Sequence, residues 1–147
     1  MAYKAKILLI EDEELSQITT RALLESLGCN VDAGSTGAEG VRLFEKSIAE
    51  QNSYDLIFID LKIFDMDGFK VARKIIELQK NDKKIPMIVL TGHTEESMKR
   101  KAKKLGFKAY IMKPLSEDDC RKVLQDFIHK ELTDNSNLLQ DNSGEGN

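Results

Sequence analysis

Residues 55–60 have the sequence DLIFID, in which four consecutive apolar residues are followed by the carboxylate of Asp60. Three more short apolar runs occur along the chain, at residues 7–10 (ILLI), 87–90 (MIVL) and 109–112 (AYIM). Hydrophobicity that is continuous rather than alternating indicates strands that are buried on both faces. A weaker strand is predicted at residues 29–33, directly after Gly28, which is placed to end a helix. The sequence therefore predicts five strands.

Longer amphipathic segments separate these runs. Helices are predicted at residues 15–27, 38–48, 69–78, 95–105 and 117–132. The last of these has the clearest pattern, because its apolar residues share one helical face and Ser116 is placed to cap its first turn. A right-handed crossover between parallel strands needs a helix, so five strands that are each followed by a helix predict an α/β protein with a doubly wound, five-stranded parallel sheet.

Length and composition favour one domain. The chain has 147 residues, of which 41% are hydrophobic, and this is enough for one compact core. We place the domain at residues 1–132 and expect residues 133–147 to be a disordered tail, since this segment is polar and acidic. Asp134, Asp141 and Glu145 are its only charged residues, so residues 1–132 carry 22 basic and 22 acidic side chains. This balance gives no reason to expect binding to nucleic acid or to a membrane.

Targeting signals and cysteine chemistry are not apparent in the sequence. No apolar run approaches the roughly 18 residues that a membrane span needs, and the first residues lack the pattern of a signal peptide. A cytoplasmic protein is therefore expected. Cys29 and Cys120 lack a CxxC or metal-ligand spacing, so we interpret them as two reduced thiols without a chemical role.

Polar residues follow four of the predicted strands. Glu11 and Asp12 come after the first strand, Asp60 after the third, Thr91 after the fourth and Lys113 after the fifth. In doubly wound sheets, ligands bind beyond the carboxyl ends of the strands, where all five of these residues are expected to lie.

The residue types predict phosphoryl transfer. Three carboxylates that converge on one edge repel one another and need either protonation or a cation. An all-oxygen cluster without His or Cys suits Mg²⁺, and Lys113 adds a second positive charge. Asp60 can then act as the nucleophile towards a phosphoryl group. The hydroxyl of Thr91 could bond a phosphoryl oxygen only after transfer, which would make its loop a two-state element.

Four segments of the chain together resemble the signatures of response-regulator receiver domains. They are residues 7–13 (ILLIEDE), residues 55–60 with 66–68 (DLIFID and MDG), residues 90–92 (LTG) and residues 113–114 (KP). The resemblance runs from about Lys6 to Lys130. It implies a flavodoxin-like fold with strand order 2-1-3-4-5. Residues 11–12 and 27–31 also resemble the corresponding segments of receivers that are attached to hybrid histidine kinases.

The resemblance also implies partners. The phosphate would come from a sensor histidine kinase or a histidine phosphotransfer protein. The chain would be a signalling module rather than an enzyme, and it would act on a downstream protein through its fourth helix, fifth strand and fifth helix. A monomer or a phosphorylation-dependent dimer is expected. Too few residues follow Leu132 for an output domain, so we expect a single-domain regulator or a receiver taken from a larger protein.

The resemblance assigns a role to each site residue. Asp12 and Asp60 would ligate Mg²⁺ directly, Glu11 would do so through water, and the carbonyl of Lys62 would complete the site. Thr91 and Tyr110 would form the switch pair. Lys113 would precede a cis peptide bond to Pro114.

The sequence departs from the family pattern in the loop after Asp60. Ile63 and Phe64 stand where the family usually has Met-Pro, so the rigidity of a proline is missing. Lys62 and His93 occupy the positions two residues beyond the phosphorylated Asp and the switch Thr. In the family these positions flank the attacking water and influence how long the phosphate lasts.

Other interpretations remain for single residues. In isolation, Glu11 and Asp12 could be acidic residues at a helix N-terminus, Lys113 an ordinary surface lysine, and Tyr110 a core aromatic. The basic residues of the fourth predicted helix could form a solvated face or a partner surface; they are Lys99, Arg100, Lys101, Lys103 and Lys104.

Two other functions are disfavoured. Residues 64–68 (FDMDG) resemble the nucleophile motif of haloacid-dehalogenase-type phosphatases, but they lie in a loop and not at the end of a strand. A flavodoxin-like cofactor binder would need a small, polar loop after the first strand to hold phosphate, whereas the acidic residues 11–14 would repel it.

Overall fold

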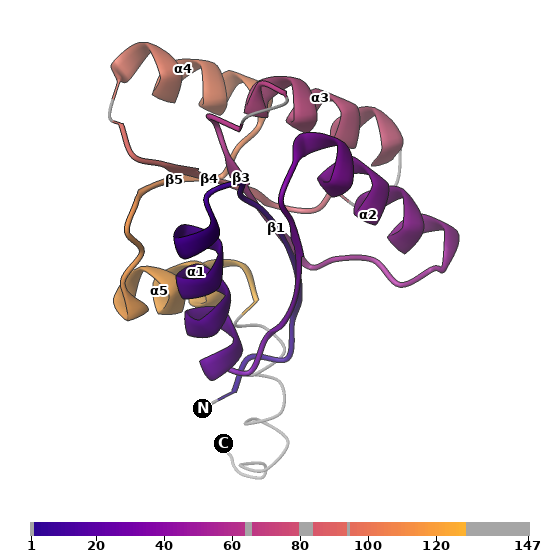
Figure 1. Cartoon of the computed structure of the whole chain (residues 1–147), viewed down its shortest axis with the longest axis vertical. Coiled ribbons are helices and arrows are strands. Elements are labelled where there is room, and N and C mark those ends of the chain that lie inside the picture. The colour runs from indigo at the N-terminus through magenta and orange to yellow at the C-terminus, as the bar shows by residue number, and fades with distance from the viewer. Residues whose placement is uncertain (1, 64–65, 80–83, 94, 129–147) are drawn as a thin grey trace, which may run out of the picture.

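The computed structural model describes residues 2–63, 66–79, 84–93 and 95–128, and it shows five strands alternating with five helices (Figure 1). The elements are β1 (Lys6–Ile10), α1 (Glu14–Ser26), β2 (Asn30–Gly34), α2 (Gly37–Ala49), β3 (Leu56–Asp60), α3 (Gly68–Gln79), β4 (Met87–Thr91), α4 (Glu96–Leu105), β5 (Ala109–Met112) and α5 (Glu117–Phe127). All pairings between neighbouring strands are parallel, in the order β2-β1-β3-β4-β5. The predicted fold class and strand order are confirmed.

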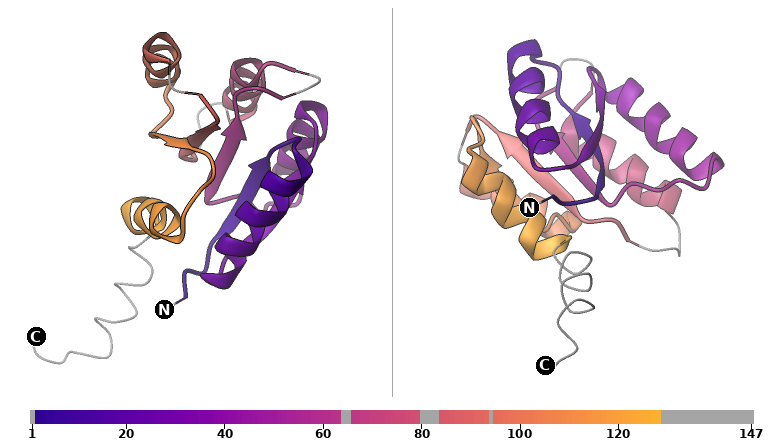
Figure 2. Two further views of the ribbon diagram at one scale, coloured as in Figure 1. Left: turned by 60° about the vertical axis from the view of Figure 1, so that its left-hand side comes forward. Right: turned by 90° about the horizontal axis from the view of Figure 1, so that it is seen from below.

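Helices cover both faces of the sheet. Figures 1 and 2 show α1 and α5 on one face and α2, α3 and α4 on the other. Ile7 and Leu9 of β1 pack with α1 and α5, whereas Leu8 and Ile10 pack with the opposite helices. Consecutive strand residues point to opposite faces, so a central strand must be apolar at every position. This explains the continuous run at residues 56–59, in which each side chain is fully buried.

At most of the element ends that the structure describes, the predicted boundary lies one residue from the observed boundary. β2 begins at Asn30 and not at Cys29, because the amide of Cys29 still bonds the carbonyl of Leu24 at the end of α1. Ser116 caps α5 as predicted, and it forms a reciprocal capping box with Asp119. That helix is described up to Phe127. Its predicted extension to residue 132 and the predicted tail at residues 133–147 lie outside the described residues.

Gly28 ends α1 in a position that only glycine suits. Its φ is +100°, and a Cβ atom there would lie 2.8 Å from the Cβ of Ala2 and 2.9 Å from the amide nitrogen of Tyr3. Both the positive φ and the close approach of the N-terminal segment explain the residue type.

The two cysteines are free and buried, on the same side of the sheet. Burial raises the pKa of Cys29 to about 12 and that of Cys120 to about 11. Because the thiolate is the reactive form, both thiols are inert near neutral pH in the folded protein. None of the helices in the described residues combines the length and the apolar character needed to cross a bilayer.

Candidate functional site

Three carboxylates meet at the carboxyl ends of two neighbouring strands. Asp60 is the last residue of β3, and Glu11 and Asp12 directly follow β1, which pairs with β3. One carboxylate oxygen from each of the three residues lies within 4.8 Å of the others. Glu11 is fully buried and Asp60 is only 4% exposed, whereas Asp12 is partly exposed. The prediction that these side chains converge is confirmed.

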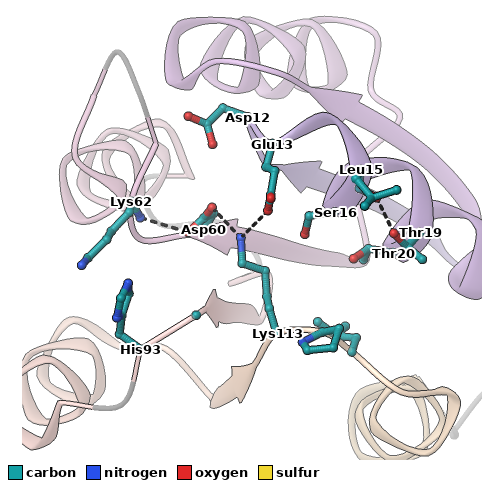
Figure 3. A pocket seen from close by; sticks show the side chains of 13 residues that line it. Asp12, Glu13, Leu15, Ser16, Thr19, Thr20, Asp60, Lys62, His93 and Lys113 are labelled. Carbon is teal, nitrogen blue, oxygen red and sulfur yellow. Dashed lines mark hydrogen bonds and ion pairs between the residues drawn. The ribbon is translucent and has the colours of Figure 1, made fainter.

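Lys113 reaches this cluster from the far side of β4. Its Nζ donates to Glu11 Oε1 at 2.9 Å. The same Nζ donates to Asp60 Oδ2 at 3.0 Å and lies 3.8 Å from Glu13 Oε1 (Figure 3). The backbone of Lys113 is anchored by a bond from its amide to the carbonyl of Thr91. The peptide bond to Pro114 is cis, as the resemblance implied. One ammonium group is thus shared by two buried carboxylates.

Glu11 is held in place by the protein itself. Ser16 donates its hydroxyl to Oε1 at 2.7 Å, and the amide of Glu13 donates to Oε2 at 3.1 Å. Together with Lys113, these donors occupy both oxygens of the side chain. A direct bond to a metal ion would compete with them, so this geometry suits the water-mediated role that the resemblance implied for Glu11.

The cluster contains more negatively charged than positively charged side chains. Burial, together with the neighbouring Glu11, raises the pKa of Asp60 to about 6. Burial would also raise the pKa of Glu11, but hydrogen bonds, above all the one from Lys113, lower it below the ordinary value. For Lys113, the two carboxylates outweigh burial and raise the pKa. One lysine therefore faces three carboxylates, and the excess negative charge favours a bound cation.

The donor set fits a hard divalent cation such as Mg²⁺. Asp12, Asp60 and Lys62 line a cavity of about 510 Å³ that is open to solvent (Figure 3). The three side chains whose ligand atoms lie within 4.8 Å of one another are all carboxylates, and no His or Cys of the described residues belongs to that group, although His93 lines the same cavity. Oxygen ligands with room for several waters are what Mg²⁺ prefers. Asp60 Oδ1 also accepts the amide hydrogen of Lys62 at 3.0 Å, which fixes the orientation of the carboxylate.

Thr91 and Tyr110 are connected through the backbone of one residue. Thr91 is fully buried, and its Oγ1 accepts the amide hydrogen of His93 at 3.2 Å. The hydroxyl of Tyr110 donates to the carbonyl oxygen of His93 at 3.3 Å. Both predicted switch residues therefore hold the loop between β4 and α4.

A family model for the response regulator receiver domain matches residues 7–125. The chain belongs to this family. The match covers the five strands except Lys6 at the start of β1, nearly all of α5, and every site residue described above.

Curated relatives of this receiver domain are histidine kinases. Hybrid signal transduction histidine kinase L of Dictyostelium discoideum is 28% identical over 124 residues, which cover 83% of this chain and 7% of the relative. Probable histidine kinase 2 of Oryza sativa subsp. indica is 33% identical over 133 residues, which cover 84% of this chain and 12% of the relative. The receiver thus spans a small part of these proteins.

Solved structures agree with this assignment. A receiver domain from Clostridium thermocellum superposes with a TM-score of 0.75 at 29% identity, covering 88% of this chain and 98% of the other. The receiver domain of a Pseudomonas aeruginosa sensor histidine kinase superposes with a TM-score of 0.71 at 30% identity, covering 86% and 98%. That structure holds a magnesium ion coordinated in its active-site cleft.

Gly68 lies close against the backbone that follows β3. A Cβ atom on Gly68 would lie 2.6 Å from the carbonyl oxygen of Asp60 and 2.7 Å from the Cα of Leu61. The amide of Gly68 bonds the carbonyl of Leu61, and Asp67 Oδ1 accepts the amide hydrogen of Phe69 at the start of α3. Ile63 is buried, whereas Phe64 lies outside the described residues. Asp67 thus caps a helix in this receiver and does not end a strand.

Sequence reasoning missed two members of the site. Ser16 and Glu13 both contact the cluster, and neither was singled out. A signal was present for Ser16, which lies five residues after Glu11 near the start of a predicted helix. Lys62 and His93, by contrast, were noted from the sequence, and both line the open side of the cavity in the receiver (Figure 3).

Proposed function

We propose that this receiver accepts a phosphoryl group on Asp60 from a phosphohistidine, carried by a sensor histidine kinase or a histidine phosphotransfer protein. The observation that supports this most strongly is the position of Lys113, which bonds both Glu11 and Asp60, while a carboxylate oxygen of Asp12 lies within 4.8 Å of theirs. The histidine kinases among its relatives support the choice of donor. With such a donor, we propose a cytoplasmic location for the module.

The proposed reaction is a displacement at phosphorus. The carboxylate of Asp60 attacks the phosphorus atom, the bond to the donor imidazole nitrogen breaks, and the electron pair leaves with the imidazole. Lys113, already 3.0 Å from Asp60 Oδ2, stabilises charge on the transferred oxygens. Asp12, Asp60 and the carbonyl of Lys62 would hold Mg²⁺ directly, and Glu11 through water. When bound, this ion neutralises charge on the phosphoryl oxygens.

The signal would leave the site through the loop between β4 and α4. Thr91 Oγ1 is an acceptor towards His93 in this structure, so its hydroxyl proton is free to be donated to a phosphoryl oxygen. That new bond would pull the loop inward and carry the carbonyl of His93, and with it Tyr110, to a new position. We propose that this alters the face formed by α4, β5 and α5, which binds a downstream protein.

Intact mass spectrometry tests the proposal. After incubation with acetyl phosphate and Mg²⁺, the chain should gain about 80 Da, the mass of one phosphoryl group. The modification should be stable in acid and labile in base, as an acyl phosphate is. No gain in mass under these conditions would contradict the proposal.

Replacing Asp12 by Asn should weaken Mg²⁺ binding without unfolding the protein. The variant loses one charged ligand, but it also relieves repulsion among three crowded carboxylates, so stability without metal should stay equal or rise. Calorimetric titration with Mg²⁺ and thermal melting in EDTA measure the two effects. Glu45→Gln is the matched control, because Glu45 is exposed on α2 and does not line the cavity, so this change should affect Mg²⁺ affinity little. A large fall in the metal-free melting temperature of Asp12→Asn would show a structural role instead.

Replacing Thr91 by Ala should separate phosphorylation from switching. Asp60 and Lys113 remain, so the mass gain should persist at a modestly reduced rate. The conformational response should be lost, because only a contact that differs between two states can shift their populations. Amide NMR shifts at residues 91–93 and 95–113, with and without beryllofluoride, measure the response. Thr91→Ser keeps the hydroxyl and should respond as wild type does. An unchanged response in Thr91→Ala would refute this route.

A further inference from the structure

The helices on the two faces of the sheet differ in charge. α3 and α4, which lie on one face, carry eight basic and two acidic side chains (Figure 1). Their neighbour α2 is neutral, with two of each. α1 and α5, on the other face, carry three basic and six acidic side chains. The even balance of charge in residues 1–132 therefore conceals one basic and one acidic side. Such an asymmetry indicates a polyanionic partner for the basic side.

The basic side chains of the two faces also differ in how they are neutralised. The three on α1 and α5, which are Arg21, Arg121 and Lys122, each form an ion pair within their own helix. Of the eight on α3 and α4, only Lys99 forms an ion pair with another described residue, Glu96 at 3.7 Å. The other seven are exposed, so their charge is available to a partner.

The cations of α3 and α4 form one continuous surface, because the two helices are in contact. The ring of Phe69 in α3 packs edge-on against that of Phe107, with centroids 6.4 Å apart. Lys101 of α4 crosses the junction, and its Nζ lies 4.6 Å from the centre of the Phe69 ring. We define the α3–α4 basic surface by six exposed residues of the two helices, which are Lys70, Arg73, Lys74, Arg100, Lys101 and Lys104.

This surface is separate from the site of Asp60. None of its six residues lines the cavity beside Asp60. None lines the cavity between α4 and β5 either, where Lys99 and Lys103 lie beside Tyr110. The α3–α4 basic surface therefore has no part in the proposed phosphoryl transfer or in the connection between Thr91 and Tyr110.

The charges of this surface destabilise the helices that carry them. Lys70 and Lys74, like Arg100 and Lys104, are four residues apart, a spacing at which like charges repel each other. Ala102 is the one buried residue of α4, so few apolar contacts offset the repulsion in that helix. Anionic groups that bind among these cations relieve the repulsion and stabilise the folded protein.

The pattern and spacing of the cations suit a nucleic-acid backbone. Residues 99–104 have the sequence KRKAKK, and a segment this rich in Lys and Arg is typical of sites that bind nucleic acid or another polyanion. Packed helices lie about 8–10 Å apart. The grooves of duplex DNA are about 6 Å and about 12 Å wide. Long side chains from the two helices can therefore contact phosphates on both strands that border one groove.

Two other polyanions fit this surface less well. A helix that binds a membrane surface inserts exposed apolar side chains. Ile76 is the one exposed large apolar residue of α3 and α4, and it lines a cavity together with Leu105. Single-stranded nucleic acid binds through aromatic side chains that stack on its bases. Phe69 is the only aromatic residue of the two helices, and it is buried. A duplex backbone needs neither feature.

We propose that the α3–α4 basic surface binds the phosphate backbone of a double-stranded nucleic acid without reading its base sequence. Lys and Arg side chains that contact phosphates fix the position of a protein on the duplex but carry no sequence information. The acidic face of α1 and α5 is repelled by the same phosphates, so the basic side is held towards the duplex. The inference goes beyond the proposed receiver function and does not depend on phosphorylation of Asp60.

Fluorescence anisotropy with a labelled DNA duplex tests the proposal. The full chain is titrated into a duplex of about 20 base pairs and arbitrary sequence, at several concentrations of NaCl between about 50 and 200 mM. Wild type should bind at about 50 mM NaCl with a Kd below about 100 µM. If all six cations neutralise phosphates, the slope of log affinity against log salt concentration should be about −5.

A triple variant and a matched control locate the binding surface. Lys70→Gln/Arg100→Gln/Lys104→Gln should lower the affinity at about 50 mM NaCl by about tenfold or more and reduce the salt slope by about 1 for each residue. The control Lys4→Gln/Arg21→Gln/Lys122→Gln removes two Lys and one Arg at exposed positions outside α3 and α4. Its affinity should stay within about threefold of wild type. Thermal melting should show both variants folded.

Four results would overturn the proposal. They are no binding by wild type at about 50 mM NaCl, wild-type affinity and salt slope in the Lys70/Arg100/Lys104 variant, an equal loss in the control, and preference for another polyanion. That preference would appear as tighter binding of a single strand of the same length, or as displacement of the duplex by phosphatidylserine vesicles at an equal concentration of phosphate. The mass gain with acetyl phosphate, measured on the same samples, tests the receiver chemistry independently.

Discussion

Replacing Asp60 by Asn should abolish the mass gain of about 80 Da that acetyl phosphate and Mg²⁺ produce. The amide is a poor nucleophile, and Glu11 is not placed to replace Asp60. Glu11 is fully buried, and both of its oxygens are bonded to Lys113, Ser16 or the amide of Glu13.

The opposite end of the same strand provides a control. Asp55 precedes β3, is partly buried, and accepts the amide hydrogen of Lys6 at 2.8 Å. Asp55→Asn makes the same chemical change and can keep that hydrogen bond, so it should be phosphorylated like wild type. A full mass gain in Asp60→Asn, located on another residue, would show that the nucleophile has been assigned wrongly.

Asp60→Asn should also stabilise the metal-free protein at alkaline pH. The pKa of Asp60 in the fold is about 6, above its ordinary value of 3.8, so the folded state binds this proton more tightly than the unfolded chain does. Stability therefore falls as pH rises from about 4 to above about 6, and it stays low at pH 8. Asp60→Asn removes this cost, which we expect to be about 1 to 3 kcal/mol. Urea unfolding in EDTA at about pH 8 measures it.

Replacing Lys113 by Met should have the largest effect on stability. Lys113 is only 15% exposed, and it bonds two carboxylates that are almost fully buried. Removing the one cation that they share leaves buried, unpaired charge, which costs about 3 to 5 kcal/mol. We expect this loss at about pH 8 without metal, and we expect Mg²⁺ to restore part of it.

The pH dependence of this variant identifies the cause. Without the lysine, the pKa values of Glu11 and Asp60 rise, so both carboxylates protonate more readily as pH falls. The variant should therefore be closer to wild type at about pH 5 than at about pH 8. Lys122→Met is the control, because Lys122 is 78% exposed and forms only a surface pair with Asp126, worth at most about 1 kcal/mol. Equal stability of Lys113→Met and wild type at both pH values would contradict the electrostatic account.

A double variant links the two predictions. If Lys113 and Asp60 stabilise each other, Asp60→Asn should restore more stability in the Lys113→Met background than it adds to wild type. Both residues belong to one hydrogen-bonded cluster, so a coupling of about 0.5 to 3 kcal/mol is expected. Additive effects would mean that Lys113 is paired mainly with Glu11.

The sequence alone determined the fold and the membership of most of the site. The run at residues 56–59 predicts a strand buried on both faces, because every position in a central parallel strand meets a helix layer. Once the sheet is parallel, the residues that follow its strands must share one edge. This is why Glu11, Asp12, Asp60, Thr91 and Lys113 could be grouped although they are far apart in the chain.

Only the tertiary structure decided how these residues divide their roles. Lys113 bonds Glu11 across 102 positions of sequence, and Ser16 turns from α1 onto the same carboxylate. The α3–α4 basic surface likewise arises from two helices that β4 separates in the chain. Local periodicity tells which face of an element is buried. It does not tell which oxygen meets which donor, because that depends on the register of the strands, the angle of each helix and the rotamer of each side chain.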